Sequence, residues 1–363
     1  MKWSDLHKQS TELSFKAAQL RAFNRSDAEG IYAQAAEFEL KALDLVPLEK
    51  ERTRGILSVS AASLLYKGRA FDRAEQFALQ TLNGRVPDEF RSQLQAILQA
   101  TWNQAAKLET DRKFLPGEVI ISISGGEVVT GGAPLDLIVN KVKTVQSLFY
   151  RTVEYLSNMP LRRRGAPIRE IQDYCRPWLF QAPAGSYQFA VAVEGPKQQD
   201  MFKTQIQPRD VTDRFLDIVQ ASAAGAEENF EALVKDEEYR DAFAKLTRNL
   251  SPSGRSAQKI RIYSYDNPKE INLGMDAREQ AKSLMPSMKV LESEASKDEI
   301  CGVLRALDLD RSWLEVDING RHHRVTNLES ALDDVIGPLV NKDVRVVVLR
   351  RGRRLEFIDI EEA

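Results

Sequence analysis

The stretch Arg176-Pro177-Trp178-Leu179-Phe180-Gln181-Ala182-Pro183-Ala184-Gly185-Ser186-Tyr187-Gln188-Phe189-Ala190-Val191-Ala192-Val193 predicts a turn followed by a buried strand. From Tyr187 onward, aromatic and β-branched residues alternate with Gln or Ala, which gives the strand one apolar face. Long helical patterns lie on either side. We therefore expect this stretch to form the central strand of a middle domain, with a helical module before it and a β-rich module after it.

Further strand signals place this middle domain at residues 113–287. Glu118 to Ser124 and Lys259 to Tyr265 are each apolar or alternating, which is typical of strands. Between them, residues 135–158 carry apolar side chains at helical spacing. This order of elements lacks the regular alternation of a doubly wound sheet, so we predict an α+β domain.

Residues 1–112 contain almost no strand signal. Their apolar positions recur at three- and four-residue steps in five segments, and short loops separate these segments. Helices connected in this way pack as antiparallel pairs. We therefore expect an N-terminal helical bundle.

One segment of this bundle resembles a tetratricopeptide repeat, and the match covers about 34 residues. It departs from the repeat at Ser58 and Arg69, where a Trp and a Gly are usual. The resemblance implies a groove for a partner protein, whereas a scaffold packed on the middle domain is the alternative. The residues that carry the resemblance are Ala62, Leu65, Phe71, Ala74, Ala78, Leu82 and Pro87. Our candidate partner-binding residues are Tyr66, Phe71, Phe90 and Trp102.

The C-terminal part reads as a polar linker, residues 288–297, followed by a small β-barrel domain, residues 298–363. Three strand patterns, a helix over Leu328 to Ile336 and two more strand patterns follow the order of an OB-like barrel, with an SH3-like barrel as the competitor. Asn319-Gly320 is a strong hairpin signal. The barrel has ten Lys and Arg against fourteen Asp and Glu, so its charge argues against a nucleic-acid groove.

The densest basic run is Arg162-Arg163-Arg164, in the middle domain. With Arg169 and Trp178 it could hold a phosphate or stack on a base. A solvated interdomain loop that pairs with acidic residues, such as those at 236–238, is the alternative interpretation.

The totals exclude several classes of protein. The 363 residues include 51 Lys and Arg and 53 Asp and Glu, so no whole-chain basic field exists for nucleic acid or anionic lipid. Cys175 and Cys301 lie far apart, which predicts a reducing compartment. Because the sequence shows no signal peptide and no membrane helix, we expect a cytoplasmic protein with no membrane partner.

No catalytic motif stands out. His7, His322 and His323 cannot form one metal site, because neighbouring side chains on a strand point to opposite faces. We also find no nucleophile elbow, no zinc spacing and no phosphate-loop Lys after the Gly131-Gly132 pair. We therefore expect no metal and no cofactor, and a non-enzymatic, bacterial-type adaptor or regulatory protein that docks a protein partner through the helical module and the small barrel. The alternative is a nucleotide- or oligonucleotide-binding sensor that uses the arginine run.

Overall fold

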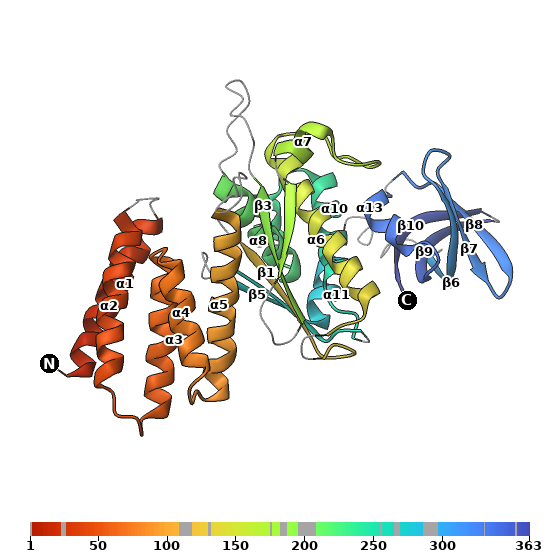
Figure 1. Ribbon diagram of the computed structural model, residues 1–363. Helices are drawn as coiled ribbons and strands as arrows, with labels where there is room; N and C mark the ends of the chain where they lie inside the picture. The colour runs from red at the N-terminus through yellow and green to blue at the C-terminus, as the bar shows by residue number, and fades with distance from the viewer. Residues whose placement is uncertain are drawn as a thin grey trace. The chain divides into compact units, whose positions relative to one another are not determined.

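The chain forms two compact units in the computed structural model (Figure 1). The first comprises residues 1–113 with 179–190, and the second comprises residues 114–178 with 191–363. The expected mixed α+β class and the N-terminal helical region are confirmed. The residues described are 2–22, 27–108, 118–129, 132–174, 176–181, 187–194, 208–254, 256–264, 269–285, 297–329, 331–352 and 354–363.

The first unit contains five helices in its described part. Each packs against the next along the chain, and α3 also packs against α5. Small residues make this close packing possible, since Ala35, Ala36, Ala61, Ala62 and Ala74 are fully buried. The helices are α1 (Trp3–Ala22), α2 (Asp27–Leu45), α3 (Glu51–Lys67), α4 (Phe71–Leu82) and α5 (Asp88–Leu108).

Five strands form one sheet with the order β2-β3-β1-β4-β5. β1 pairs antiparallel with β4, and β4 pairs antiparallel with β5. The strands are β1 (Val119–Ser124), β2 (Arg176–Gln181), β3 (Tyr187–Glu194), β4 (Lys259–Tyr263) and β5 (Glu270–Leu273).

Two expectations about the stretch at 176–193 were wrong. Its strand, β3, is not central, because β1 occupies the middle of the sheet. The predicted turn also begins with a strand, β2, which contains Pro177. Proline lacks an N–H group and is tolerated on a sheet edge, which is where β2 lies. Residues 182–186 of the predicted turn lie outside the described residues.

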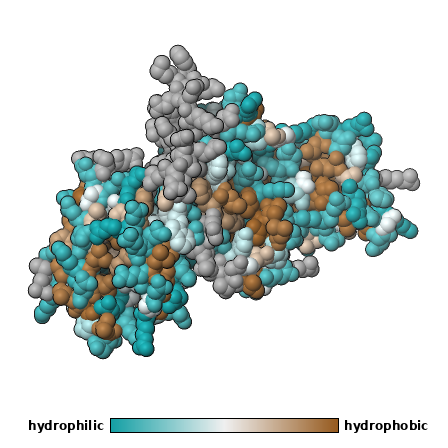
Figure 2. All heavy atoms as spheres, in the orientation of Figure 1, coloured by the Kyte–Doolittle hydropathy of each residue, from teal (hydrophilic) through white to brown (hydrophobic). Residues whose placement is uncertain are grey.

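The helices of the second unit pack on one another, and α8 and α11 also contact β5. Helix α6 has a strongly amphipathic pattern and buries Val145, Leu148, Phe149 and Val153, as its spacing predicted. Apolar side chains also show on the visible face of the molecule (Figure 2), and α6 exposes Leu135 in its first turn. The helices are α6 (Leu135–Leu156), α7 (Arg169–Tyr174), α8 (Pro208–Ala223), α9 (Glu227–Leu233), α10 (Glu237–Leu250) and α11 (Met275–Ser283).

Five C-terminal strands pair in the closed order β10-β8-β7-β6-β9, and we call them the C-terminal ring. β8 and β10 are parallel, whereas the other pairs are antiparallel. Asn319 and Gly320 both have positive φ in the β7–β8 turn, as the hairpin signal predicted. The strands are β6 (Lys297–Asp308), β7 (Trp313–Ile318), β8 (Arg321–Thr326), β9 (Asp343–Arg351) and β10 (Arg354–Glu362).

The connection between β8 and β9 differs from the sequence expectation. The predicted helix over Leu328 to Ile336 is wrong in length, because α13 comprises only Asp333–Ile336 and a 3-10 turn, η1 (Gly337–Leu339), follows it. Leu328, Ala331 and Leu332 are nevertheless buried. The apolar pattern therefore reflects packing against the ring and not a helix. Nearly all of the predicted linker 288–297 lies outside the described residues.

In the described part of the chain, no helix combines the length and the apolar character needed to cross a lipid bilayer.

Candidate functional site: a charged junction in the second unit

Arg248, near the end of α10, is fully buried and points at the last strand of the C-terminal ring. One end of its guanidinium forms an ion pair with Asp359, whose side chain is only 2% exposed. Nη2 donates to the carbonyl oxygen of Ile360 at 2.7 Å, and Nε donates to Asn249 Oδ1 at 3.3 Å. Every edge of this buried cation therefore meets an acceptor, as a buried guanidinium requires.

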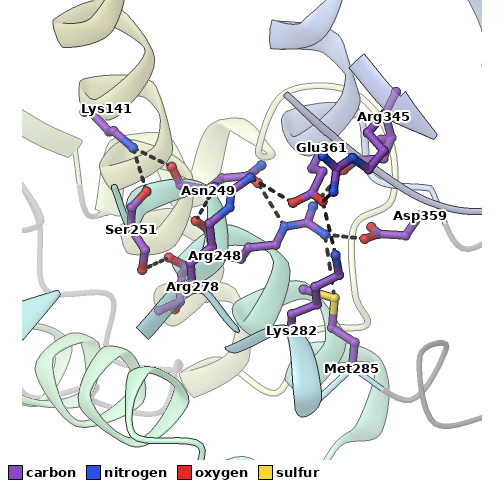
Figure 3. A network of polar contacts seen from close by, with 12 residues as sticks. Lys141, Arg248, Asn249, Ser251, Arg278, Lys282, Met285, Arg345, Asp359 and Glu361 are labelled. Carbon is purple, nitrogen blue, oxygen red and sulfur yellow. Dashed lines mark hydrogen bonds and ion pairs between the residues drawn. The ribbon is translucent and has the colours of Figure 1, made fainter. Parts of the chain in front are cut away.

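Next to this pair, three cations converge on one carboxylate, that of Glu361 (Figure 3). Arg278 Nη2 lies 2.8 Å and Lys282 Nζ lies 3.1 Å from the Glu361 oxygens. Arg345 reaches the same carboxylate from β9 at 3.9 Å. Burial raises the pKa of Glu361, but Arg248, Arg278 and Lys282 outweigh burial, so the pKa ends below its usual value.

Lys141, in the second turn of α6, closes the C-terminal end of α10. Its Nζ donates to the carbonyl oxygens of Asn249, Leu250 and Ser251, at 2.8, 2.9 and 3.1 Å. These carbonyls have lost their helical partners, and a cation there also suits the helix dipole. Burial, with the positive charge of Arg278, lowers the pKa of Lys141 to about 7. The three carbonyls favour the ammonium form, since only that form has three N–H donors.

A second charged contact joins α6 to α13, the short helix between β8 and β9. Arg151 is fully buried, and its Nε and Nη2 both bind the Asp334 carboxylate at 3.1 Å. Its third nitrogen donates to the carbonyl oxygen of Arg162. Glu154, one turn further along α6, binds Arg162 Nε at 2.8 Å. This two-pronged geometry fixes orientation as well as contact.

The predicted arginine run Arg162-Arg163-Arg164 lies at this second contact. Arg162 is mostly buried between Glu154 and the two aspartates of α13. Arg163 binds Glu238 at 2.7 Å and donates to the carbonyl oxygen of Glu329. Arg164 lies 3.0 Å from Asp310, in the turn between β6 and β7. Each of the three consecutive arginines therefore faces a carboxylate, and all three contact segments that connect the ring strands.

The other two residues proposed for a nucleotide site lie on different elements. Arg169 is exposed and begins α7. Trp178 is partly buried on β2, where its Nε1 donates to Glu194 Oε2 at 2.7 Å. A ligand-binding role for these residues stays a prediction.

The candidate partner-binding residues of the first unit divide into packed and exposed side chains. Phe90 is buried and lies against Gly55, where an added Cβ would stand 2.2 Å from the ring. Tyr66 and Phe71 are partly buried with ring centres 5.8 Å apart. Trp102 is 42% exposed, and its Nε1 donates to Glu75 at 2.9 Å. Trp102 is therefore the most accessible of the four.

Sequence reasoning missed the principal charges of the junction, namely Lys141, Arg151, Arg248, Asp334, Asp359 and Glu361. A signal existed for some of them, because Arg151 interrupts the apolar run Leu148 to Val153 and Asp359 interrupts Phe357 to Ile360. A charge inside an apolar run is buried only with a partner. The carboxylate partners of Arg151 and Arg248 are 183 and 111 positions away, and Arg278 and Lys282 are 83 and 79 positions from Glu361, so spacing could not identify them.

The described residues contain no group of three or more His, Cys, Asp or Glu side chains placed to hold a metal ion. Cys301 is an exposed free thiol, and Cys175 lies outside the described residues. No known family model, curated protein or solved structure matches this chain.

Proposed function

We propose that the protein is a non-enzymatic adaptor that binds a protein partner through its helical module. The observation that carries this proposal is the engagement of the junction charges. Arg151, Arg248 and the arginine run bind fixed carboxylates and carbonyls of the same chain. A side chain held in this way serves architecture, whereas a ligand site needs groups turned toward solvent or a pocket.

The ion pairs supply a geometric role rather than net stability. Burying a charge pair costs solvation free energy, and the attraction between the two charges offsets only part of that cost. The pair forms only when the two side chains have one particular orientation. Two such contacts, at α13 and at β10, define one orientation of the C-terminal ring on the rest of the second unit. An adaptor benefits from this arrangement because the surfaces of its second unit keep a constant relationship to one another.

The architecture of both ends supports the proposal. We propose a tetratricopeptide-like arrangement for α1–α5, since Ala62, Ala74 and Ala78 of the resembling segment are fully buried between helices. We also propose that the C-terminal ring is OB-like. Its parallel β8–β10 pair, its antiparallel β6–β9 pair and the helix between β8 and β9 support that assignment over the SH3-like one.

The test is purification of the full chain from its own host, alongside Trp102→Ala and the control Phe15→Ala. Phe15 is a solvent-facing aromatic residue on α1, and at 67% it is more exposed than Trp102 at 42%. We expect one stoichiometric protein partner by mass spectrometry, retained by the control and lost from Trp102→Ala. A partner kept by both variants, or none at all, contradicts the proposal.

The same preparation tests the nucleotide-binding alternative. A raised ratio of nucleic-acid to protein absorbance, with a released nucleotide, would favour it. The variant to examine is Arg163→Ala/Arg164→Ala, because these two side chains are 42% and 45% exposed and Arg162 is structural. On our account, this variant leaves the absorbance ratio unchanged.

A further inference from the structure

We infer that the cations around Glu361 form a binding site for a phosphoryl group of a small soluble molecule. Arg278, Lys282 and Arg345 surround the single carboxylate of Glu361, which leaves three positive charges against one negative charge. Arg248 and Lys342 do not change this balance, because each has its own carboxylate, Asp359 and Glu362.

The excess positive charge also acts on the neighbouring Lys141 side chain. Burial is the main cause of the lowered pKa of Lys141, and the charges of Arg278 and Lys342 add to that shift, against the opposing effect of Glu362. A field that disfavours one more cation favours an anion. The proposal stands on the arrangement of the cations, and this field agrees with it.

Two of the cations are held close to Glu361, and the third is accessible to solvent. Arg278 and Lys282 lie one turn apart on α11, with side chains 14% and 17% exposed. Arg345 comes from β9, opposite Glu361 across the β9–β10 pair, and its side chain is 46% exposed. At 3.9 Å from Glu361 Oε1, the Arg345 Nη1 contact is beyond hydrogen-bond length, so its donors can turn to a ligand. Figure 3 shows these side chains coming from different elements toward one point.

The chemistry of the cluster favours a phosphoryl group over a carboxylate. A phosphate monoester is close to a dianion at neutral pH and so matches the net charge of two. An arginine fork can take two of its oxygens, and a lysine ammonium acts as a point charge beside it. The phosphoryl group could belong to inorganic phosphate, to pyrophosphate or to a nucleotide.

The experiment is isothermal titration of the full chain in phosphate-free buffer at low salt, with inorganic phosphate, pyrophosphate and AMP as probes. Arg345→Gln should weaken binding about tenfold, the cost of one charged hydrogen bond. Arg350→Gln is the matched control, because Arg350 lies on the same strand, is 53% exposed and pairs with Asp298 instead. Binding by this control should equal that of the unaltered chain.

A second variant should change the affinity for the ligand in the opposite direction. Glu361→Gln removes the internal carboxylate that competes with the ligand, so it should tighten binding several-fold, and circular dichroism establishes that it folds. Equal affinity for phosphate and AMP identifies the phosphoryl group alone as the ligand, whereas tighter AMP binding identifies a nucleotide. Absence of saturable binding, equal weakening by Arg345→Gln and Arg350→Gln, or weaker binding by folded Glu361→Gln overturns the proposal.

Discussion

Arg248 and Asp359 lie 111 positions apart in the chain and form an ion pair in which the side chains are 0% and 2% exposed. The pair joins the end of α10 to the last strand of the C-terminal ring. Since neither charge can reach water, each depends on the other for its solvation. The pair therefore couples two segments that no local signal in the sequence connects.

Removing one member of this pair should destabilise the fold strongly. Arg248→Met leaves Asp359 as an uncompensated buried charge, and we expect a loss of about 3–5 kcal/mol in the free energy of unfolding by urea. The double variant Arg248→Met/Asp359→Leu should recover part of that loss, because it removes both charges. The control is Arg261→Met, whose surface pair with Glu270 should contribute less than about 1 kcal/mol. Additive losses in the double variant would show that the two residues are not coupled.

The contact at α13 allows a comparison between a buried and an exposed aspartate. Asp334 is 12% exposed and holds Arg151, whereas Asp310 is 93% exposed and holds Arg164. Asp334→Ala should cost about 3 kcal/mol or more, since it leaves the Arg151 guanidinium without its two-pronged acceptor. Asp310→Ala should leave the urea midpoint unchanged. Similar midpoints for both variants would contradict the assignment of Asp334 as the anchor.

Because the pKa of Lys141 is lowered, we expect the free energy of unfolding to rise between about pH 7 and pH 10. Its pKa is about 7 in the folded chain and 10.5 when unperturbed, so between these values the unfolded chain holds a proton that the folded chain has released. Stability then increases with pH, with a slope approaching about 1.4 kcal/mol per pH unit, the value for one proton. Below pH 7 both states are protonated, and the slope from this group vanishes.

The measurement is a series of urea titrations at fixed pH values on the unaltered chain and on Lys141→Met. The variant should lose the slope and should also be less stable, because three carbonyl groups at the end of α10 lose their donor. Lys143→Met, at an exposed position on the same helix, should keep the slope. If the slope survives in Lys141→Met, the three carbonyls hold this lysine charged in the folded chain and its pKa is not lowered.

Much of the fold follows from the sequence. The periodicity of residues 135–158 predicted α6, the Asn319-Gly320 pair predicted a tight hairpin, and the three- and four-residue steps of residues 1–112 predicted the N-terminal helices. These features depend on neighbours in the chain, which spacing reveals. Two expectations were wrong, namely the central position of β3 and the helix beginning at Leu328. Both features depend on packing against residues that are distant in the sequence.

The site was harder to predict than the fold for the same reason. The run of like charge at Arg162, Arg163 and Arg164 indicated a candidate ligand site. The carboxylates that these arginines bind come from α6, α10, α13 and the β6–β7 turn. A run of arginines looks the same in sequence whether it faces a ligand or another part of the chain. Only the arrangement in space shows which partners it meets.

The central claim is that the junction makes the C-terminal ring and the rest of the second unit one cooperative structure. The most direct measurement uses two single-tryptophan chains, one that keeps Trp178 on β2 and one that keeps Trp313 on β7, with the other tryptophans changed to Phe. Urea unfolding followed by fluorescence should give the same midpoint for both probes. Adding Arg151→Met and Arg248→Met to each chain should separate the two midpoints. Different midpoints with the junction intact would contradict the account.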